Sequence, residues 1–131
     1  MNRGEHALLR IADGVVVLDL KGEHDLATTA PIYLLLVTLC ETSDLVVVDL
    51  TSTTFVDSSM LETLVRAERT ASDNGTRFRL QLGGGQIVRT AFVVSGLLDY
   101  FEVCETREEA LGGFVDADGS RVGVPPRGGG S

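Results

Sequence analysis

Hydrophobic positions follow two different periods along the chain, and these periods predict strands alternating with helices. Apolar runs rich in β-branched residues, at 8–12 and 15–20, flank Asp13-Gly14, a dipeptide that favours a tight hairpin turn. A continuous apolar run at 45–50 is typical of a central strand that is covered on both faces. The sequence therefore predicts an N-terminal hairpin followed by a buried strand.

The segment between the hairpin and the buried strand predicts a helix. After the polar loop Lys21–Asp25, the side chains of Thr28 and Thr29 are suited to cap a helix start. Pro31 is tolerated in the first turn of this helix, where an N–H group has no partner within the helix. We expect the helix to end near Glu41.

Helical spacing returns after the buried strand. A second helix is predicted from Met60 to a left-handed cap at Asn74-Gly75. Its predicted apolar stripe consists of Met60, Leu64, Ala67 and Ala71. Alternation at 78–82 predicts a strand with one wetter face, on which Arg79 and Gln81 lie. The remaining expected elements are a helix at 87–95, a short edge strand at 101–104, and a helix opened by a capping box of Thr106 and Glu109.

This order of elements, β-β-α-β-α-β-α-(β)-α, favours an α/β fold. We expect a mostly parallel β-sheet with an N-terminal hairpin, packed against about four helices through right-handed crossovers. The expected domain spans 7–115. The segment 116–131 is rich in glycine and proline and predicts a flexible C-terminal tail.

Composition narrows the classes of function. The chain has 131 residues, enough for one core, and its acidic residues outnumber Lys and Arg by 19 to 11. The basic residues are scattered and do not provide the phosphate-neutralising surface that nucleic-acid binding needs, so we expect a basic or amphipathic protein partner instead. No apolar run has the length of a membrane span. Cys40 and Cys104 lie far apart and are expected to be two buried thiols in a reduced cytoplasm.

The stretch "PIYLLLVTLC" at 31–40 is apolar on every side, which is unusual for a surface helix. Four of its residues are predicted to face the sheet: Ile32, Leu36, Leu39 and Cys40. Three are then predicted to point outward: Tyr33, Leu34 and Val37. Such a patch predicts contact with another protein or a homodimer through this helix. The alternative is that the C-terminal tail covers the patch.

The triplet Asp57-Ser58-Ser59 lies between the apolar run and the second helix. A capping box explains part of it, because Ser59 would accept a hydrogen bond from the N–H of Glu62 while the Glu62 side chain reaches back. Ser58 is left without a role in that box. It follows the carboxyl end of a strand, where open α/β sheets place their sites, and a phosphate there would meet free helix N–H groups. The local sequence is compatible both with a helix cap alone and with a modified serine at Ser58.

Other candidate motifs are weaker. The glycines at 83–85 lie between a strand and a helix but lack the Lys-Ser/Thr ending of a nucleotide-binding loop, which favours a flexible turn. The triplet Glu23-His24-Asp25 has ligand-type side chains without metal-site spacing, and it is interpreted as a solvated loop available to a partner. His6 and His24 have no catalytic motif around them. We therefore expect no enzyme activity, no metal and no cofactor.

Three longer stretches carry a resemblance to a known family. The stretches "LKGEHDLAT" (20–28), "LVVVDLTSTTFVDSS" (45–59) and "VRTAFVVSGLLDYFEV" (88–103) resemble the signatures of a STAS domain protein of the bacterial anti-sigma factor antagonist family. In that family the serine directly after the Asp is phosphorylated by an anti-sigma factor with serine kinase activity, which implies Ser58 here. A PP2C-type phosphatase is implied as the opposing enzyme.

The resemblance also implies a partner-binding surface. It comprises Glu23, Asp25, Asp57, Ser58, Ser59 and Met60. The implied function is a cytoplasmic switch: with Ser58 unmodified, the chain binds the anti-sigma factor kinase and so releases a sigma factor. Met60 departs from the glycine usual in the family, and we expect its side chain beside the switch, where it narrows kinase access or adds an apolar contact.

Two alternatives to the switch stay open. One is an unphosphorylated STAS scaffold or transport-accessory subunit that binds through the same surface, which Met60 favours slightly. The other is a small-ligand or nucleotide-binding module that uses the glycines at 83–85. The absence of a phosphate-binding lysine after these glycines argues against this alternative.

Overall fold

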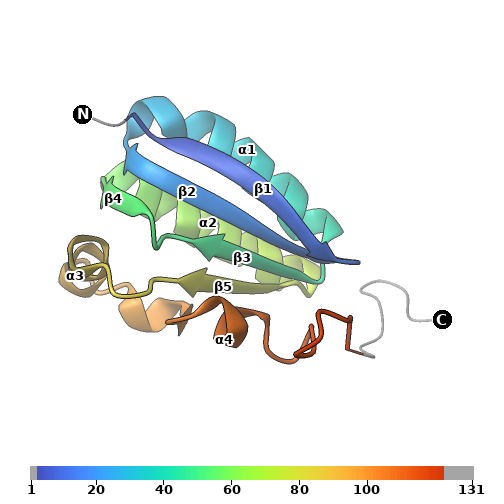
Figure 1. Cartoon of the computed structure of the whole chain (residues 1–131). Coiled ribbons are helices and arrows are strands. Elements are labelled where there is room, and N and C mark those ends of the chain that lie inside the picture. Colours follow the sequence, from blue (N-terminus) through green and yellow to red (C-terminus); the bar gives the residue numbers. More distant parts are fainter. Residues whose placement is uncertain (1–2, 123–131) are drawn as a thin grey trace.

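The computed structural model describes residues 3–122 as a sheet with helices on both faces (Figure 1). The strands are β1 (Glu5–Ala12), β2 (Val15–His24), β3 (Leu45–Asp49), β4 (Thr53–Val56), β5 (Arg77–Gln81) and β6 (Glu102–Cys104). The helices are α1 (Leu26–Thr42), α2 (Ser58–Asn74), α3 (Gln86–Val94), the short 3-10 helix η1 (Leu98–Tyr100) and α4 (Arg107–Leu111). The predicted α/β class and element order are confirmed, with β4 as an additional strand.

The sheet has the order β1-β2-β3-β5-β6, and β4 pairs with the end of β2. Only β1 and β2 are antiparallel; they form the predicted hairpin, in which Gly14 has a φ of 73°. The other pairs are parallel, so the carboxyl ends of β2, β3 and β5 lie at one edge of the sheet. β2 extends through Lys21–His24, which was expected to be a loop, because β4 gives this stretch a strand to pair with.

The first face of the sheet carries the main core. α1 and α2 pack against it, and the predicted stripe from Met60 to Ala71 on α2 is buried there. The predicted inward side of α1, from Ile32 to Cys40, is buried in the same core. Gly75 ends α2 in the left-handed conformation with a φ of 72°, as the sequence predicts. β3 is buried along its whole length.

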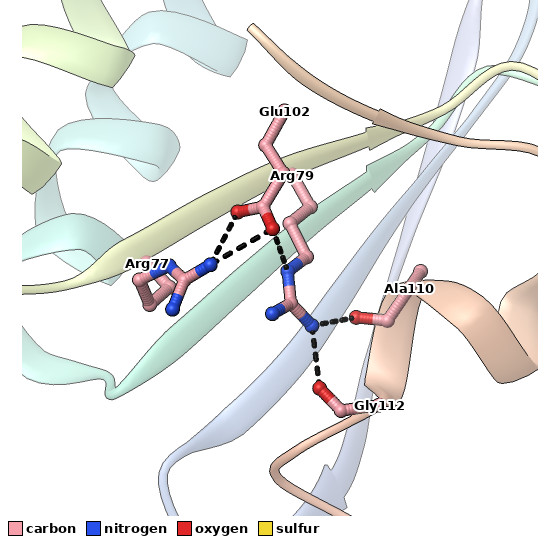
Figure 2. A network of polar contacts seen from close by, with 5 residues as sticks. All are labelled: Arg77, Arg79, Glu102, Ala110 and Gly112. Atoms are coloured by element: carbon pink, nitrogen blue, oxygen red, sulfur yellow. Dashed lines mark hydrogen bonds and ion pairs between the residues drawn. The ribbon is translucent and has the colours of Figure 1, made fainter.

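The second face is covered by α4, so the predicted wetter face of β5 is wrong. Arg79 and Gln81 are buried under α4 and the residues that follow it. One Arg79 nitrogen donates to the carbonyls of Ala110 and Gly112, at 2.9 and 2.8 Å, and its Nε lies 3.1 Å from the Glu102 carboxylate (Figure 2). Arginine therefore occupies a buried position because carbonyls at the end of α4 and a carboxylate satisfy its charge.

The chain after α4 continues across this second face. The Phe114 ring lies between two guanidinium groups, with Arg79 Cζ 5.4 Å and Arg121 Cζ 5.3 Å from its centroid. Arg121 also donates to the carboxylate of Asp44 at 2.7 Å. Residues 116–122, which the sequence placed in a flexible tail, are thus attached to the domain. The rest of the predicted tail, 123–131, lies outside the described residues.

The outward side of α1 is only partly open. Leu34 is 67% exposed, whereas Tyr33 and Val37 are half-buried, and Arg66 of α2 lies over the Tyr33 ring at 5.9 Å. The described part of the C-terminal segment contacts the other face of the sheet, so it does not cover Leu34. Contact of this helix with a partner or a second copy stays a prediction.

Two further observations concern cysteines and membranes. Cys40 is buried, but Cys104 is half-buried rather than buried as expected, and neither forms a disulfide. Within residues 3–122, none of the helices combines the length and apolar character that crossing a bilayer requires.

Candidate functional site

The pairing of β2 with β4 brings two helix starts together at one edge of the sheet. His24 ends β2 and lies opposite Val56, which ends β4. The N–H of Asp57 donates to the carbonyl of His24 at 3.2 Å, so the chain leaves both strands at the same level. α1 and α2 therefore begin side by side, and their positive dipole ends point to one surface.

An aspartate caps each of these helices. Asp25 Oδ1 accepts from the N–H of Ala27 at 2.9 Å at the start of α1. Asp57 Oδ1 accepts from the N–H of Met60 at 3.1 Å at the start of α2, and from the Ser59 hydroxyl at 2.6 Å. Ionised carboxylates at these positions satisfy helix N–H groups and interact favourably with the dipole.

The predicted capping box at Ser59 is therefore wrong. The Ser59 hydroxyl donates to Asp57, and the Glu62 side chain forms an ion pair with Arg66 at 2.9 Å, one turn further along α2. The helix starts earlier than the apolar period indicates, because Met60 is only the first residue that points inward. Asp57, Ser58 and Ser59 all have side chains that can cap, and the carboxylate is the strongest acceptor among them.

The predicted caps of α1 are wrong for the same reason. Thr28 and Thr29 lie inside the first turn of α1, and their hydroxyls donate to the Asp25 carbonyl at 3.1 and 2.8 Å. Asp25, which the sequence assigned to the partner surface, also has this capping role. Pro31 is the sixth residue of α1 and lies beyond the first turn, in which the sequence placed it.

Ser58 is the first residue of α2 and is exposed. Within residues 3–122, its hydroxyl makes no hydrogen bond, in contrast to the neighbouring Ser59 hydroxyl. The residue thus presents a free hydroxyl at the position that follows Asp57, at the positive end of a 17-residue helix. This geometry leaves Ser58 accessible to an enzyme and without a structural role of its own.

Met60 does not lie beside Ser58 on the surface, contrary to the expectation from the sequence. Its side chain is fully buried in the core between α2 and the sheet. It therefore neither narrows the approach to Ser58 nor offers a contact to a partner. The substitution of methionine for the glycine usual in the family is accommodated by the core.

Glu23, near the end of β2, and Asp25, the residue between β2 and α1, lie next to this site at the same end of the sheet. Both residues line a cavity of about 470 Å³, together with Arg3 and the first turns of α1. His24 is not in a solvated loop as expected but is fully buried. Its Nε2 lies 3.0 Å from the Lys21 carbonyl. Burial lowers the pKa of the His24 ring, and this effect exceeds the increase that hydrogen bonds to backbone groups cause.

The glycines at 83–85 form a tight strand-to-helix turn. Gly83 has a φ of 61°, and a Cβ at this position would lie 2.7 Å from the Thr51 side chain. Gly85 precedes α3 without a side-chain cap. The conformational need of this turn accounts for Gly83 without any ligand.

One feature of the site has no signature in the sequence. Thr29 Oγ1 of α1 and Ser59 Oγ of α2 lie 3.1 Å apart and connect the two helix starts. The residues are 30 positions apart, and each alone matches an ordinary polar position near a helix start. Only the unpredicted strand β4 brings them together.

The Asp57 carboxylate should contribute to stability in a pH-dependent way. Burial raises its pKa, but hydrogen bonds from the Ser59 hydroxyl and from backbone N–H groups outweigh burial, so the pKa is lowered below 3.8. A lowered folded-state pKa adds stability above the unfolded pKa, and this stability is lost as pH falls through the folded pKa. The contribution should therefore be complete at neutral pH, begin to decrease near pH 3.8 and disappear once the pH is below the lowered folded-state pKa.

We expect Asp57→Ala to lower the free energy of unfolding by about 1 kcal/mol at neutral pH, because the cap is lost. Asp57→Asn should keep most of the cap, and its difference from wild type should shrink as pH falls below the unfolded pKa. Urea unfolding of the three proteins at several pH values measures both effects. Asp73→Ala, which removes an exposed carboxylate at the other end of α2, is the control and should change stability by less than about 0.5 kcal/mol.

Solved structures show the same fold. An anti-sigma factor antagonist from Mycobacterium paratuberculosis has 23% sequence identity and a TM-score of 0.72, over 83% of this chain and 92% of that one. The Bacillus cell fate determinant SpoIIAA in its phosphorylated form has 23% identity and a TM-score of 0.63, over 82% and 96%. A sulfate transporter family protein from Wolinella succinogenes has 17% identity and a TM-score of 0.66, over 75% and 82%.

Sequence comparison assigns the family. A search of curated proteins gives no match. The family profile described as the STAS domain matches residues 6–110, which include all six strands except the first residue of β1. This match covers most of the chain and contains both helix starts of the site. The chain therefore belongs to the STAS domain family.

Proposed function

We propose that this protein is an anti-sigma factor antagonist that acts as a phosphorylation-controlled switch in the cytoplasm. With Ser58 unmodified it binds an anti-sigma factor that is also a serine kinase, and a sigma factor is released. Phosphorylation of Ser58 ends the binding, and a PP2C-type phosphatase restores it. The observation that carries this proposal is the exposed Ser58 hydroxyl, without a partner in the described chain, beside the Asp57 carboxylate.

Electrostatics explain how such a modification acts. A phosphate on Ser58 adds about 1.5 to 2 negative charges next to the ionised Asp57 carboxylate. The positive end of the α2 dipole tolerates this charge, so the domain stays folded. At a protein interface the same charge repels acidic groups and must lose water, so binding is weakened while the fold is kept.

Exposed apolar side chains around the site support a protein partner. Leu26 at the start of α1 is 74% exposed, Phe55 of β4 is 46% exposed, and Ile87 at the start of α3 is 67% exposed. The starts of α1 and α3 and strand β4, which carry them, lie at the same end of the sheet as the start of α2 (Figure 1). Apolar anchors beside the acidic Glu23 and Asp25 favour a partner with apolar and basic groups.

The kinase activity is assigned to the partner. The glycine turn at 83–85 lacks a phosphate-binding lysine, and Gly83 has a conformational explanation. The partner would therefore hold ATP, while this chain supplies only the acceptor hydroxyl. In this role the protein is a substrate and binding module rather than an enzyme.

Phosphopeptide mapping tests this proposal. The protein is incubated with ATP and a candidate anti-sigma factor kinase, and the modified residue is identified by mass spectrometry. Phosphate on Ser58, and none on a Ser58→Ala variant, is the expected result. Phosphate confined to Ser59, Thr53 or Thr54 would refute the assignment.

A second candidate is an unphosphorylated scaffold or transport-accessory subunit. The likeness to the Wolinella sulfate transporter family protein favours keeping it, because that structure shares the fold. The same surface would bind a partner constitutively. Absence of phosphate after incubation with candidate kinases, with partner binding retained, would make this the better proposal. A homodimer through residues 31–40 is compatible with either function.

A further inference from the structure

Two hydroxyl groups join the starts of α1 and α2. Thr29 Oγ1 and Ser59 Oγ lie 3.1 Å apart. Ser59 Oγ donates to Asp57 Oδ1 at 2.6 Å, and Thr29 Oγ1 donates to the Asp25 carbonyl at 2.8 Å. Thr29 is buried and Ser59 and Asp57 are half-buried, so these contacts form a partly buried row of hydrogen bonds. They connect Asp57, which caps α2 and precedes Ser58, with Asp25, which caps α1 and belongs to the expected partner-binding surface.

The number of hydroxyl protons allows this row of hydrogen bonds two arrangements. Two hydroxyls carry two protons but make three contacts, so one contact is always without a proton. The ionised Asp57 carboxylate is the strongest acceptor and takes the Ser59 proton. The Thr29 proton then has two acceptors, Ser59 Oγ and the Asp25 carbonyl. This carbonyl also accepts from the N–H groups of Thr28 and Thr29 at 3.1 Å, so it stays satisfied either way.

We propose that Thr29 is a positioning residue that transmits the phosphorylation state of Ser58 to the loop between β2 and α1. This inference rests on the proposed function. A phosphate on Ser58 repels the Asp57 carboxylate and competes with it for the N–H groups of α2. When the carboxylate withdraws, the Ser59 proton turns to Thr29 Oγ1. The Thr29 proton is then confined to the Asp25 carbonyl.

The effect of phosphorylation thus reaches Asp25 through the Thr29 hydroxyl, which has two hydrogen-bonding states. Unmodified Ser58 leaves the Thr29 proton divided between two acceptors, and phosphorylated Ser58 selects one of them. Such a bias on discrete arrangements is the physical basis of coupling between sites. The anti-sigma partner would detect the change at Glu23 and Asp25 as well as at the phosphate itself.

Two other connections between the helix starts bypass Thr29. The N–H of Asp57 bonds the His24 carbonyl, and the N–H of Leu26 contributes to lowering the Asp57 pKa. The first joins two backbone groups and the second joins a backbone N–H to the Asp57 carboxylate, and neither involves the Thr29 side chain. Thr29→Val keeps the shape of the residue and removes only the hydroxyl, so it separates the proposed route from these two.

The test is amide chemical-shift mapping by NMR on the full chain. Phosphoserine is incorporated at position 58 during translation, and spectra are compared with those of the unmodified chain. In wild type we expect shift changes at the amides of Ala27, Thr28 and Thr29 of α1, in addition to those around Ser58. Thr29→Val should lose the changes at these three amides and keep those around Ser58 and at the Leu26 amide, which contacts Asp57 without Thr29.

Two further variants keep the test specific. Thr29→Ser retains the hydroxyl and should preserve the α1 shift changes. Thr38→Val removes another hydroxyl from α1. This hydroxyl bonds the Leu34 carbonyl at 3.1 Å and has no contact with α2, so the variant should also preserve the α1 shift changes. If Thr29→Val does not fold, Thr29→Ala serves in its place.

Undiminished α1 shift changes in the variant that lacks the Thr29 hydroxyl would overturn the inference, as would their absence in wild type. Because phosphoserine is installed without a kinase, this outcome is independent of whether a kinase acts on Ser58. Failure of the phosphopeptide mapping, by contrast, would refute the proposed function and leave the NMR result intact.

Discussion

Ser58→Ala should bind the anti-sigma partner constitutively, and Ser58→Asp should bind it at least about tenfold more weakly. The aspartate places a second carboxylate beside Asp57, and about 1.4 kcal/mol of repulsion and desolvation at the interface is enough for a tenfold loss. Neither variant should unfold the domain, because Ser58 is exposed and makes no internal hydrogen bond within the described chain. Affinities from calorimetry or surface plasmon resonance measure the difference.

The control for this pair is Ser72→Asp. Ser72 is exposed near the other end of α2, so this variant adds the same charge to the same helix away from the proposed interface. It should bind like wild type. Equal affinities of the two Ser58 variants, or an equal loss with Ser72→Asp, would show that charge at the start of α2 does not control binding.

Arg79→Met should lower the free energy of unfolding by about 2 to 3 kcal/mol, whereas Arg77→Met should lower it by less than about 1 kcal/mol. Both arginines contact the carboxylate of Glu102 (Figure 2). The Arg79 side chain is only 9% exposed and that of Arg77 is 54% exposed. Charged hydrogen bonds to buried groups contribute more than exposed ion pairs, because water does not compete for them.

The loss at Arg79 has a structural origin that can be observed separately. Without its guanidinium group, the carbonyls of Ala110 and Gly112 lose their donor, and Phe114 loses one of its two cationic neighbours. Hydrogen exchange should therefore become faster in α4 and the segment after it. Equal destabilisation by the two substitutions, or unchanged exchange in α4, would contradict this role of Arg79.

The parts of the fold that depend on local pattern could be predicted from the sequence. The hairpin at Asp13-Gly14, the buried strand β3 and the stripe of α2 each follow from the period of apolar residues or from a turn dipeptide. The sequence also predicts the N-terminal cap of α4. The Thr106 hydroxyl accepts a hydrogen bond from the Glu109 N–H at 3.2 Å. Such features are set by residues close in sequence.

The errors arise where a distant segment changes the environment of a local pattern. The alternation in β5 indicates a wet face, but α4 covers that face and supplies carbonyls for Arg79. The stretch Lys21–His24 is polar, yet pairing with β4 makes it a strand. At the site, the sequence assigned the cap of α2 to Ser59, whereas Asp57 forms it, because several adjacent residues have side chains that can cap.

The ends of the described chain lie on opposite sides of the domain. Arg3 bridges to Glu23 at the edge that carries Ser58, whereas Arg121 contacts Asp44 and the carbonyl of Asp13 at the edge where β2 and β3 begin. A biosensor that tethers the protein after residue 122 would therefore leave the Ser58 surface facing the solution. Tethering through the N-terminal segment would place the sensor matrix against that surface, and an apparent absence of binding would then report the orientation of the molecule.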